Sequence, residues 1–149
     1  MPRLRLSAFT AAFGLLFLLA ACGGMQQTAQ GPISLKASLS GAQENPPVAS
    51  PSTGSSTLTY DQASKRLTWS LTWSPLTGPA TMAHFHGPAA PGANAGVALP
   101  IGAAGMTSPA NGQATLTDAQ AADLLAGRWY INIHTAAHPG GEIRGQVTR

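Results

Sequence analysis

Short stretches of alternating apolar and polar residues occur along most of the chain, and each one ends at turn-forming residues. A period of two is typical of a β-strand with one buried face. In the clearest example, residues 66–73, serine and threonine alternate mostly with Leu67, Trp69, Leu71 and Trp73. We expect both tryptophans to pack in a core. The pattern predicts strands at residues 33–39, 56–60, 66–73, 82–86, 97–101, 113–116, 129–135 and 142–147.

One segment carries a helix signal. Thr117 and Gln120 have the spacing of a capping box, Asp118 suits the positive end of a helix, and Gly127 suits the position just after its last residue. We expect a single short helix at residues 118–126. About seven to eight antiparallel strands with one short helix indicate an all-β fold, a Greek-key β-sandwich or barrel.

The N-terminus has the features of a bacterial lipoprotein signal peptide, expected at residues 1–21. Two arginines precede an apolar stretch at residues 8–21, which is shorter than the roughly 20 residues that span a bilayer. The stretch ends in Leu-Ala-Ala-Cys, which resembles the lipobox. We expect Cys22, the only cysteine of the chain, to be the lipidation site, because the diacylglyceryl group is attached to its sulfur.

After the predicted lipidation site, the sequence divides into a tether and a single domain. Residues 22–32 are rich in glycine, glutamine, threonine and alanine, and we expect a flexible tether there. Residues 33–149 then form one domain. Gly23 follows the cysteine where an aspartate would favour inner-membrane retention. We therefore expect a protein of the cell envelope that is lipid-anchored to the outer membrane or displayed at the surface.

Charge excludes one class of partner. The formal net charge is +3, but loss of the two signal-peptide arginines leaves six basic and five acidic residues. No basic run is present, and basic and aromatic residues are not interleaved. We expect no nucleic-acid binding. No Gly-x-Ser-x-Gly motif is present either, so nothing supports hydrolase chemistry.

All four histidines lie in two short segments of the chain. His84 and His86 are separated by one residue on an expected strand, so they point to the same face with Cα atoms about 7 Å apart. His134 ends a second strand-like stretch. Pairing of these strands would bring three imidazoles together, and neutral imidazole is a favoured ligand of zinc and copper.

This cluster predicts a site for one metal ion, copper or zinc, with copper the first choice in an oxidising compartment. His138, four residues after His134, is a candidate fourth ligand. Histidines are also commonly buried and hydrogen-bonded without a metal. An adhesion or protein-interaction module with an unidentified protein partner and purely structural histidines is therefore the alternative.

Two further charged residues are candidates for supporting roles. Glu44 lies beside a Pro-Pro pair that stiffens the chain, and we expect it to pair with an arginine such as Arg128 or Arg144. Arg144 lies between glycines, where backbones can pack closely. Structural pairing and attraction of an anion both remain open for it.

Four motifs in this order together resemble the chordin-type (CHRD) domain family. They are residues 40–48 (SGAQENPPV), 83–89 (AHFHGPA), 125–135 (LAGRWYINIHT) and 139–146 (PGGEIRGQ). The family is named after chordin, an extracellular antagonist of bone morphogenetic proteins, and its bacterial members are commonly single secreted or lipid-anchored domains. The resemblance covers nearly all of residues 33–149 and implies a fold and a location more firmly than an activity.

The order of the histidines and of residues 141–147 is also similar to that in Cu,Zn superoxide dismutase. This second resemblance implies a superoxide dismutase-like fold, copper ligands at His84, His86 and His134, and Arg144 as the nearby cation. The loop at residues 87–96 contains no histidine, so the bridging and zinc-site histidines are missing. A dismutase-like redox enzyme is accordingly the third hypothesis, after an envelope-anchored metal-binding module and an adhesion module.

Overall fold

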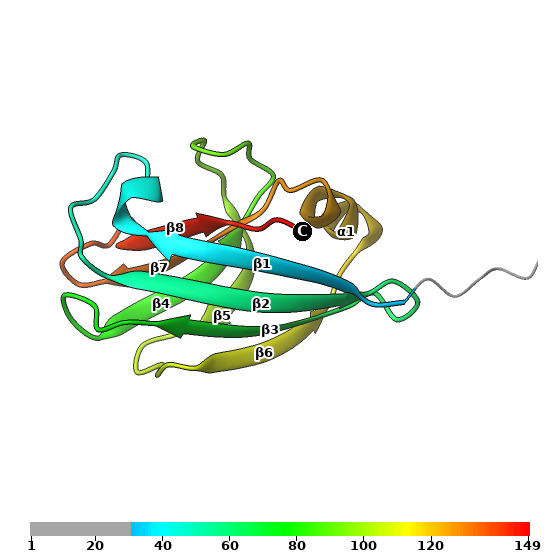
Figure 1. The fold of residues 1–149 in the computed structure, drawn as a ribbon, viewed down its shortest axis with the longest axis horizontal. Helices are drawn as coiled ribbons and strands as arrows, with labels where there is room; N and C mark the ends of the chain where they lie inside the picture. The colour runs from blue at the N-terminus through cyan, green and yellow to red at the C-terminus, as the bar shows by residue number, and fades with distance from the viewer. Residues whose placement is uncertain (1–30) are drawn as a thin grey trace, which may run out of the picture.

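Eight antiparallel strands form one sheet that curls until its two edges come close together (Figure 1). The computed structural model describes residues 31–149, so the predicted signal peptide, the Cys22 anchor and most of the tether at residues 22–32 lie outside the described residues. The strands are β1 (Ile33–Ser40), β2 (Thr53–Asp61), β3 (Arg66–Trp73), β4 (Ala80–His86), β5 (Val97–Gly102), β6 (Ala110–Thr115), β7 (Tyr130–Thr135) and β8 (Ile143–Gln146).

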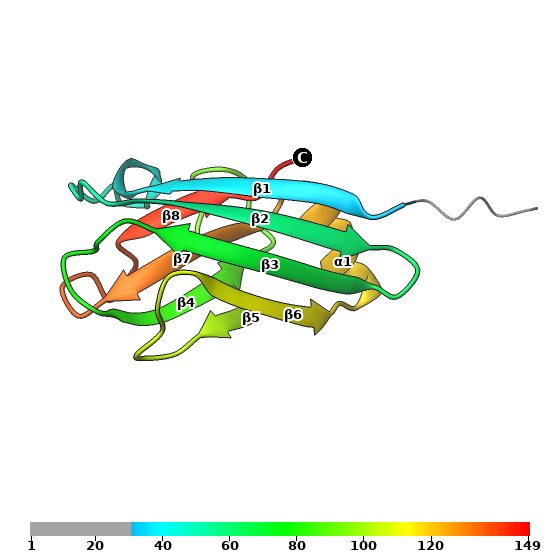
Figure 2. The ribbon, with the colours of Figure 1, turned by 60° about the horizontal axis from the view of Figure 1, so that its bottom comes forward.

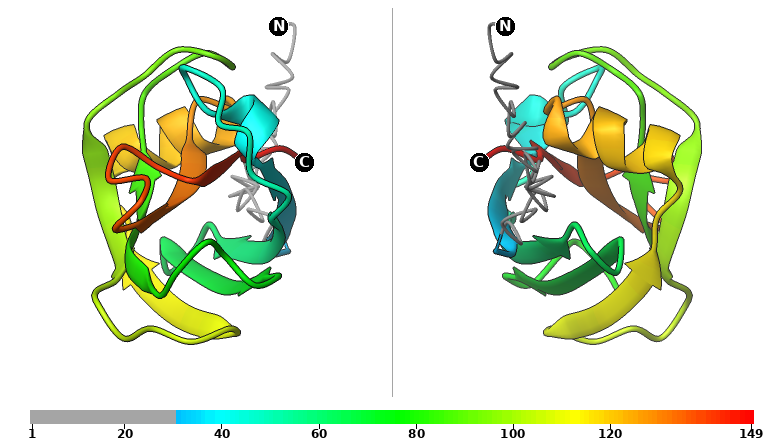
Figure 3. Two further views of the ribbon diagram at one scale, coloured as in Figure 1. Left: turned by 90° about the vertical axis from the view of Figure 1, so that its left-hand side faces the viewer. Right: turned by 90° about the vertical axis from the view of Figure 1, so that its right-hand side faces the viewer.

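The order of the strands in the sheet is β5-β4-β7-β8-β1-β2-β3-β6. β3 therefore lies beside β6 and β4 beside β7, which are the non-sequential neighbours of a Greek-key arrangement. The outer strands β5 and β6 contact each other without pairing, and Figure 3 shows the resulting, nearly closed barrel from its ends. The predicted all-β class with about eight strands is confirmed.

Residue alternation places the core inside this barrel. Leu67, Trp69 and Leu71 of β3 are buried, and Trp73 at the end of the strand is partly buried against them, as the pattern predicts. Phe85 of β4 is fully buried, with its ring centroid 5.2 Å from that of Trp69 in an edge-to-face contact. Aromatic packing of this kind adds to the stabilisation from apolar burial.

The predicted helix is present as α1 (Asp118–Leu125), which joins β6 to β7 at one end of the barrel (Figure 2). Thr117 and Gln120 form the expected capping box, and Gly127 follows with a φ of +70°. Leu124 is buried and seals this end of the core. Within residues 31–149, no helix has the length and apolar character to cross a bilayer.

Two loops cover the outer face of β7 and β8. The connection from β1 to β2 begins with the 3-10 turn η1 (Gly41–Gln43), which the sequence pattern did not predict. This connection lies on the same side of the barrel as the β4–β5 loop (Figure 1). Asn45 Nδ2 donates to the Gly92 carbonyl at 2.7 Å, and Asn94 Nδ2 donates to the Asn45 carbonyl at 2.9 Å. These side chains hold the two loops together above the sheet.

A substitution at Gly145 tests how closely the backbone of β8 packs against that of β1. A Cβ atom at this position would overlap the carbonyl group of Ser38 in the neighbouring strand. We expect Gly145→Ala to lower the free energy of unfolding by about 1–3 kcal/mol, because the two backbones would have to separate. Gly96→Ala is the control, since a methyl group there meets no atom within 4 Å. Chemical denaturation of both variants checks this, and equal stability would contradict the close packing.

Candidate metal centre

Three imidazoles converge on the outer face of β4 and β7. His84 and His86 lie on either side of the inward-facing Phe85 in β4, and His134 lies in β7. His84 Nδ1 is 3.2 Å from His134 Nε2, and one ring nitrogen from each of the three histidines lies within 4.8 Å of the others. The structure therefore brings together three of the four histidines that the sequence singled out.

His86 is held in one orientation by two contacts. Its Nδ1 lies 2.9 Å from the carbonyl oxygen of Ala95, and its ring stacks on Tyr130 with the centroids 4.9 Å apart and the planes 6° from parallel. A carbonyl can only accept a hydrogen bond, so Nδ1 carries the hydrogen and the neutral ring has its lone pair on Nε2. That Nε2 is buried and has no hydrogen-bond partner among the described residues.

His134 is oriented in the same way. Its Nδ1 is 2.9 Å from the Pro139 carbonyl oxygen, which leaves the lone pair of Nε2 facing His84. Metal-binding histidines commonly donate their second ring N–H to a backbone carbonyl, which fixes the tautomer and the ring plane. With its lone pair on Nε2, His134 accepts a hydrogen bond from His84 Nδ1. A zinc or copper ion would take the place of this hydrogen bond, with the Nε2 atoms of His86 and His134 and one ring nitrogen of His84 as its donors.

The electrostatic environment keeps two of these rings in the ligating form. Burial lowers the pKa of His84, and the neighbouring His134 and His86 lower it further. Burial also lowers the pKa of His134; the bond to Pro139 opposes this shift, whereas His86 adds to it. Both imidazoles are therefore neutral at neutral pH, and a neutral ring is the form that binds a metal.

Arg144 fixes the loop that orients His86. Its guanidinium donates to Asn94 Oδ1 at 2.9 Å and to the Ala93 carbonyl at 2.6 Å, and it lies 3.4 Å from the centroid of the Tyr130 ring. The Tyr130 hydroxyl in turn accepts a hydrogen bond from the Ala95 N–H at 3.2 Å. Arg144 is only 2% exposed, so the structure shows it positioning the loop; its predicted role in anion attraction stays a prediction.

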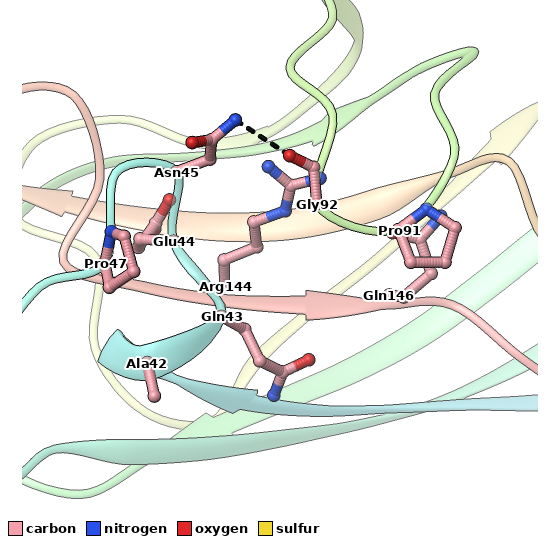
Figure 4. Close-up of a pocket in the computed structure, with 9 residues that line it drawn as sticks. All are labelled: Ala42, Gln43, Glu44, Asn45, Pro47, Pro91, Gly92, Arg144 and Gln146. Carbon is pink, nitrogen blue, oxygen red and sulfur yellow. Dashed lines mark hydrogen bonds between the residues drawn. The ribbon is translucent and has the colours of Figure 1, made fainter.

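Glu44 lies near Arg144, and both residues line a pocket of about 350 Å³ between the two loops (Figure 4). Glu44 Oε1 is buried without a hydrogen-bond partner among the described residues. Burial raises the pKa of Glu44 to about 7, although the charge of Arg144 lowers it in part. The prediction that Glu44 pairs with Arg128 is wrong, because Arg128 forms an ion pair with Asp123 instead. The alternative partner, Arg144, influences Glu44 through its charge without forming an ion pair.

Glu142 is a buried residue that the sequence analysis missed. Its carboxylate accepts hydrogen bonds from the hydroxyls of Ser50, Ser52 and Thr135 and from both the backbone and the hydroxyl of Thr77. Burial alone would raise the pKa of Glu142, but these donors outweigh it and lower the pKa to about 2. The carboxylate thereby ties three loops to the strand that carries the third histidine.

The remaining residues near the cluster fall into two groups. Tyr130 and Asn132 alternate with buried isoleucines on β7 and share a face with His134, so the alternation of this strand could have placed them at the site. His138 is half-buried in the turn after β7, where its backbone pairs with Thr135. It is not part of the three-histidine cluster.

The chain matches the model of the CHRD domain family over residues 35–147, a span that includes all three clustered histidines. No curated protein and no solved structure matches the chain.

The buried carboxyl of Glu44 makes a specific prediction about pH. Its pKa in the folded protein, about 7, lies above the ordinary value of 4.5, so the folded state binds more protons than the unfolded state between these values. The contribution of Glu44 to stability must therefore fall as the pH rises from 4.5 to 7. We expect Glu44→Gln to be more stable than the wild type at pH 8 and to lose this advantage as the pH falls to 4.5.

Denaturant titrations of both proteins across this pH range provide the measurement. Asp61→Asn is a matched control, because Asp61 is an exposed carboxyl whose pKa is lowered mainly by hydrogen bonds from Ser64. The free energy of unfolding should change in the opposite direction for this control. Asp61→Asn should be less stable than the wild type at pH values where the Asp61 carboxyl is ionised, because the folded state favours the ionised form. A difference between Glu44→Gln and the wild type that does not change with pH would show that Glu44 titrates normally.

Proposed function

This chain belongs to the CHRD domain family, and we propose that it is an envelope-anchored binding lipoprotein whose histidine cluster holds one transition-metal ion. Family membership supports a binding or interaction module, and the cluster gives that module a chemically defined ligand. Copper is our first choice for the ion and zinc the alternative.

One observation carries the proposal. The Nε2 atom of His86 is buried, has no hydrogen-bond partner among the described residues, and belongs to a ring whose other nitrogen is bound to Ala95. A buried polar atom without a partner costs about 1–3 kcal/mol, and native proteins generally avoid it. Four other buried side-chain atoms among the described residues also lack a partner, but His86 Nε2 is the one that belongs to the cluster of three imidazoles. A metal shared with His84 and His134 would satisfy this lone pair.

The donor set supports copper as the first choice. The cluster consists of three imidazoles, and no carboxylate belongs to it. Imidazole suits both copper and zinc, and copper binds nitrogen donors more tightly than zinc in the order of divalent affinities. His84 and His86 are both partly exposed, so the cluster lies at the surface of the sheet, where an ion can reach it.

We predict saturable one-to-one binding of Cu(II) or Zn(II) to the purified protein. His84→Ala, His86→Ala and His134→Ala should each remove most of the affinity, and binding should weaken as the pH falls through the histidine range because protonated imidazole cannot ligate. His138→Ala is the matched control and should cost much less, because His138 lies outside the cluster. Isothermal titration measures all four variants, and bound metal should also raise the melting temperature.

Other outcomes of the same titration identify other functions. Structural histidines in an adhesion module would give no saturable binding, and the alanine variants would then only lose stability. Equal binding by the triple variant and the wild type would end the metal proposal. A superoxide assay on the copper-loaded protein tests whether the site also carries a dismutase-like redox activity.

The anchor is a separate part of the proposal and has its own test. We expect Cys22→Ser to leave an unprocessed or mislocalised precursor, because the thioether link to the diacylglyceryl group cannot form on serine. Fractionation of cells and mass spectrometry of the N-terminus measure this. A variant that is processed normally and recovered with the membrane would refute lipidation at Cys22.

A further inference from the structure

Met82 is an exposed apolar residue beside the histidine cluster. Among the described residues, it and Val97 are the two large hydrophobic side chains that are exposed, with 41% of Met82 accessible. Single exposed apolar residues are common on protein surfaces and need no explanation by themselves. The place of Met82 in the sheet is what distinguishes it.

The strand register puts Met82 next to two of the three imidazoles. Met82, His84 and His86 alternate along β4 with Ala83 and Phe85, both of which are fully buried. The three exposed or half-buried residues therefore share the outer face of the strand. Across the sheet, Met82 is the direct partner of His134. Directly opposed residues of antiparallel strands point to the same face, with Cβ atoms about 4.5–5.5 Å apart.

We propose that Met82 supplies a thioether ligand to copper(I) at this cluster, so that the site binds both oxidation states of copper. This inference rests on the metal-binding function proposed above. A thioether is a soft ligand that favours Cu(I), whereas imidazole alone also accommodates Cu(II) and Zn(II). The methionine side chain is unbranched and has three rotatable bonds, so its sulfur can move toward an ion held between His84 and His134.

The groups around the cluster indicate why Met82, rather than a neighbouring oxygen atom, would be the additional ligand of Cu(I). The Ala95 carbonyl and the Tyr130 ring occupy the side of His86, and the Pro139 carbonyl occupies Nδ1 of His134. These two carbonyl oxygens are therefore committed to orienting the rings. Asn132 Oδ1, opposite His84 in the sheet, has no hydrogen-bond partner among the described residues, but an amide oxygen is a hard donor, which Cu(I) disfavours relative to a thioether. Met82 carries a thioether on the accessible side of the site, where no packing interaction of the core requires it.

Met106 provides a matched control within the same chain. Its thioether and methyl group pack against Gly102, and it is partly buried against the core rather than exposed beside the histidines. Met82→Leu and Met106→Leu therefore remove the same chemical group from two places. Only the first place adjoins the cluster.

The test compares Cu(I) and Cu(II) binding by the purified wild-type protein and these two variants. Cu(I) is titrated anaerobically in competition with a chromophoric chelator, and Cu(II) is titrated in air. We expect Met82→Leu to weaken Cu(I) binding about 10- to 100-fold, the range seen when a group supporting a metal site is lost. Cu(II) affinity should stay within about twofold, because three imidazoles suffice for that ion. Met106→Leu should change neither.

X-ray absorption of the Cu(I)-loaded wild type adds a measurement that requires no variant. A copper–sulfur scattering path is expected there and should be absent in Met82→Leu; its absence from the wild type would overturn the inference. Unchanged Cu(I) affinity in Met82→Leu, or equal losses of Cu(I) and Cu(II), would overturn it as well. In these cases one-to-one Cu(II) binding by the wild type would leave the three-histidine site standing. A wild type that binds neither ion would refute both proposals.

Discussion

The burial of Phe85 fixes the register of β4, and the geometry of the histidine cluster depends on that register. The Phe85 ring lies 5.2 Å from Trp69 and 5.7 Å from Trp129, measured between centroids, and the side chain is fully buried. A slip of one residue would turn Phe85 to the surface and both neighbouring histidines into the core. The large cost of exposing an aromatic ring and burying two imidazoles therefore keeps His84 and His86 on the outer face.

Backbone carbonyls then set the chemistry of these imidazoles. Ala95 and Pro139 belong to loops that close over the sheet, so the loops that cover this face also orient the two rings. The Ala95 loop is in turn held by Arg144 and Tyr130. Rigid support of this kind is what a metal site requires, because a donor displaced by even a fraction of an ångström loses much of its affinity. The loops position the imidazoles through their backbone carbonyls.

Two buried carboxyl groups near the site have pKa values shifted in opposite directions. Glu142 is a fully hydrogen-bonded carboxylate with a pKa of about 2, and it joins loops together. Glu44 has a pKa of about 7 because burial leaves its Oε1 without a partner among the described residues. Neither carboxylate belongs to the histidine cluster, which therefore remains a set of nitrogen donors. A soft or borderline metal fits such a set better than a hard cation such as calcium or magnesium.

The sequence by itself determined the local elements, because local periodicity reports which face of a strand is buried. It correctly predicted the all-β class, the strands and the capped helix, and the shared face of His84 and His86 follows from the same period of two. Pairing of β4 with β7, which brings in His134, was a reasonable hypothesis and is confirmed. Only the tertiary structure could decide which loop residues close over that face. Contacts between segments far apart in the chain decided four features of the site. They are the hydrogen bond from Arg144 to Asn94, the separation of Glu44 from Arg128, the burial of Glu142 and the position of Met82 opposite His134. Such contacts leave no periodic signal in the sequence, because loop conformation and strand register are fixed by the packing of the whole barrel.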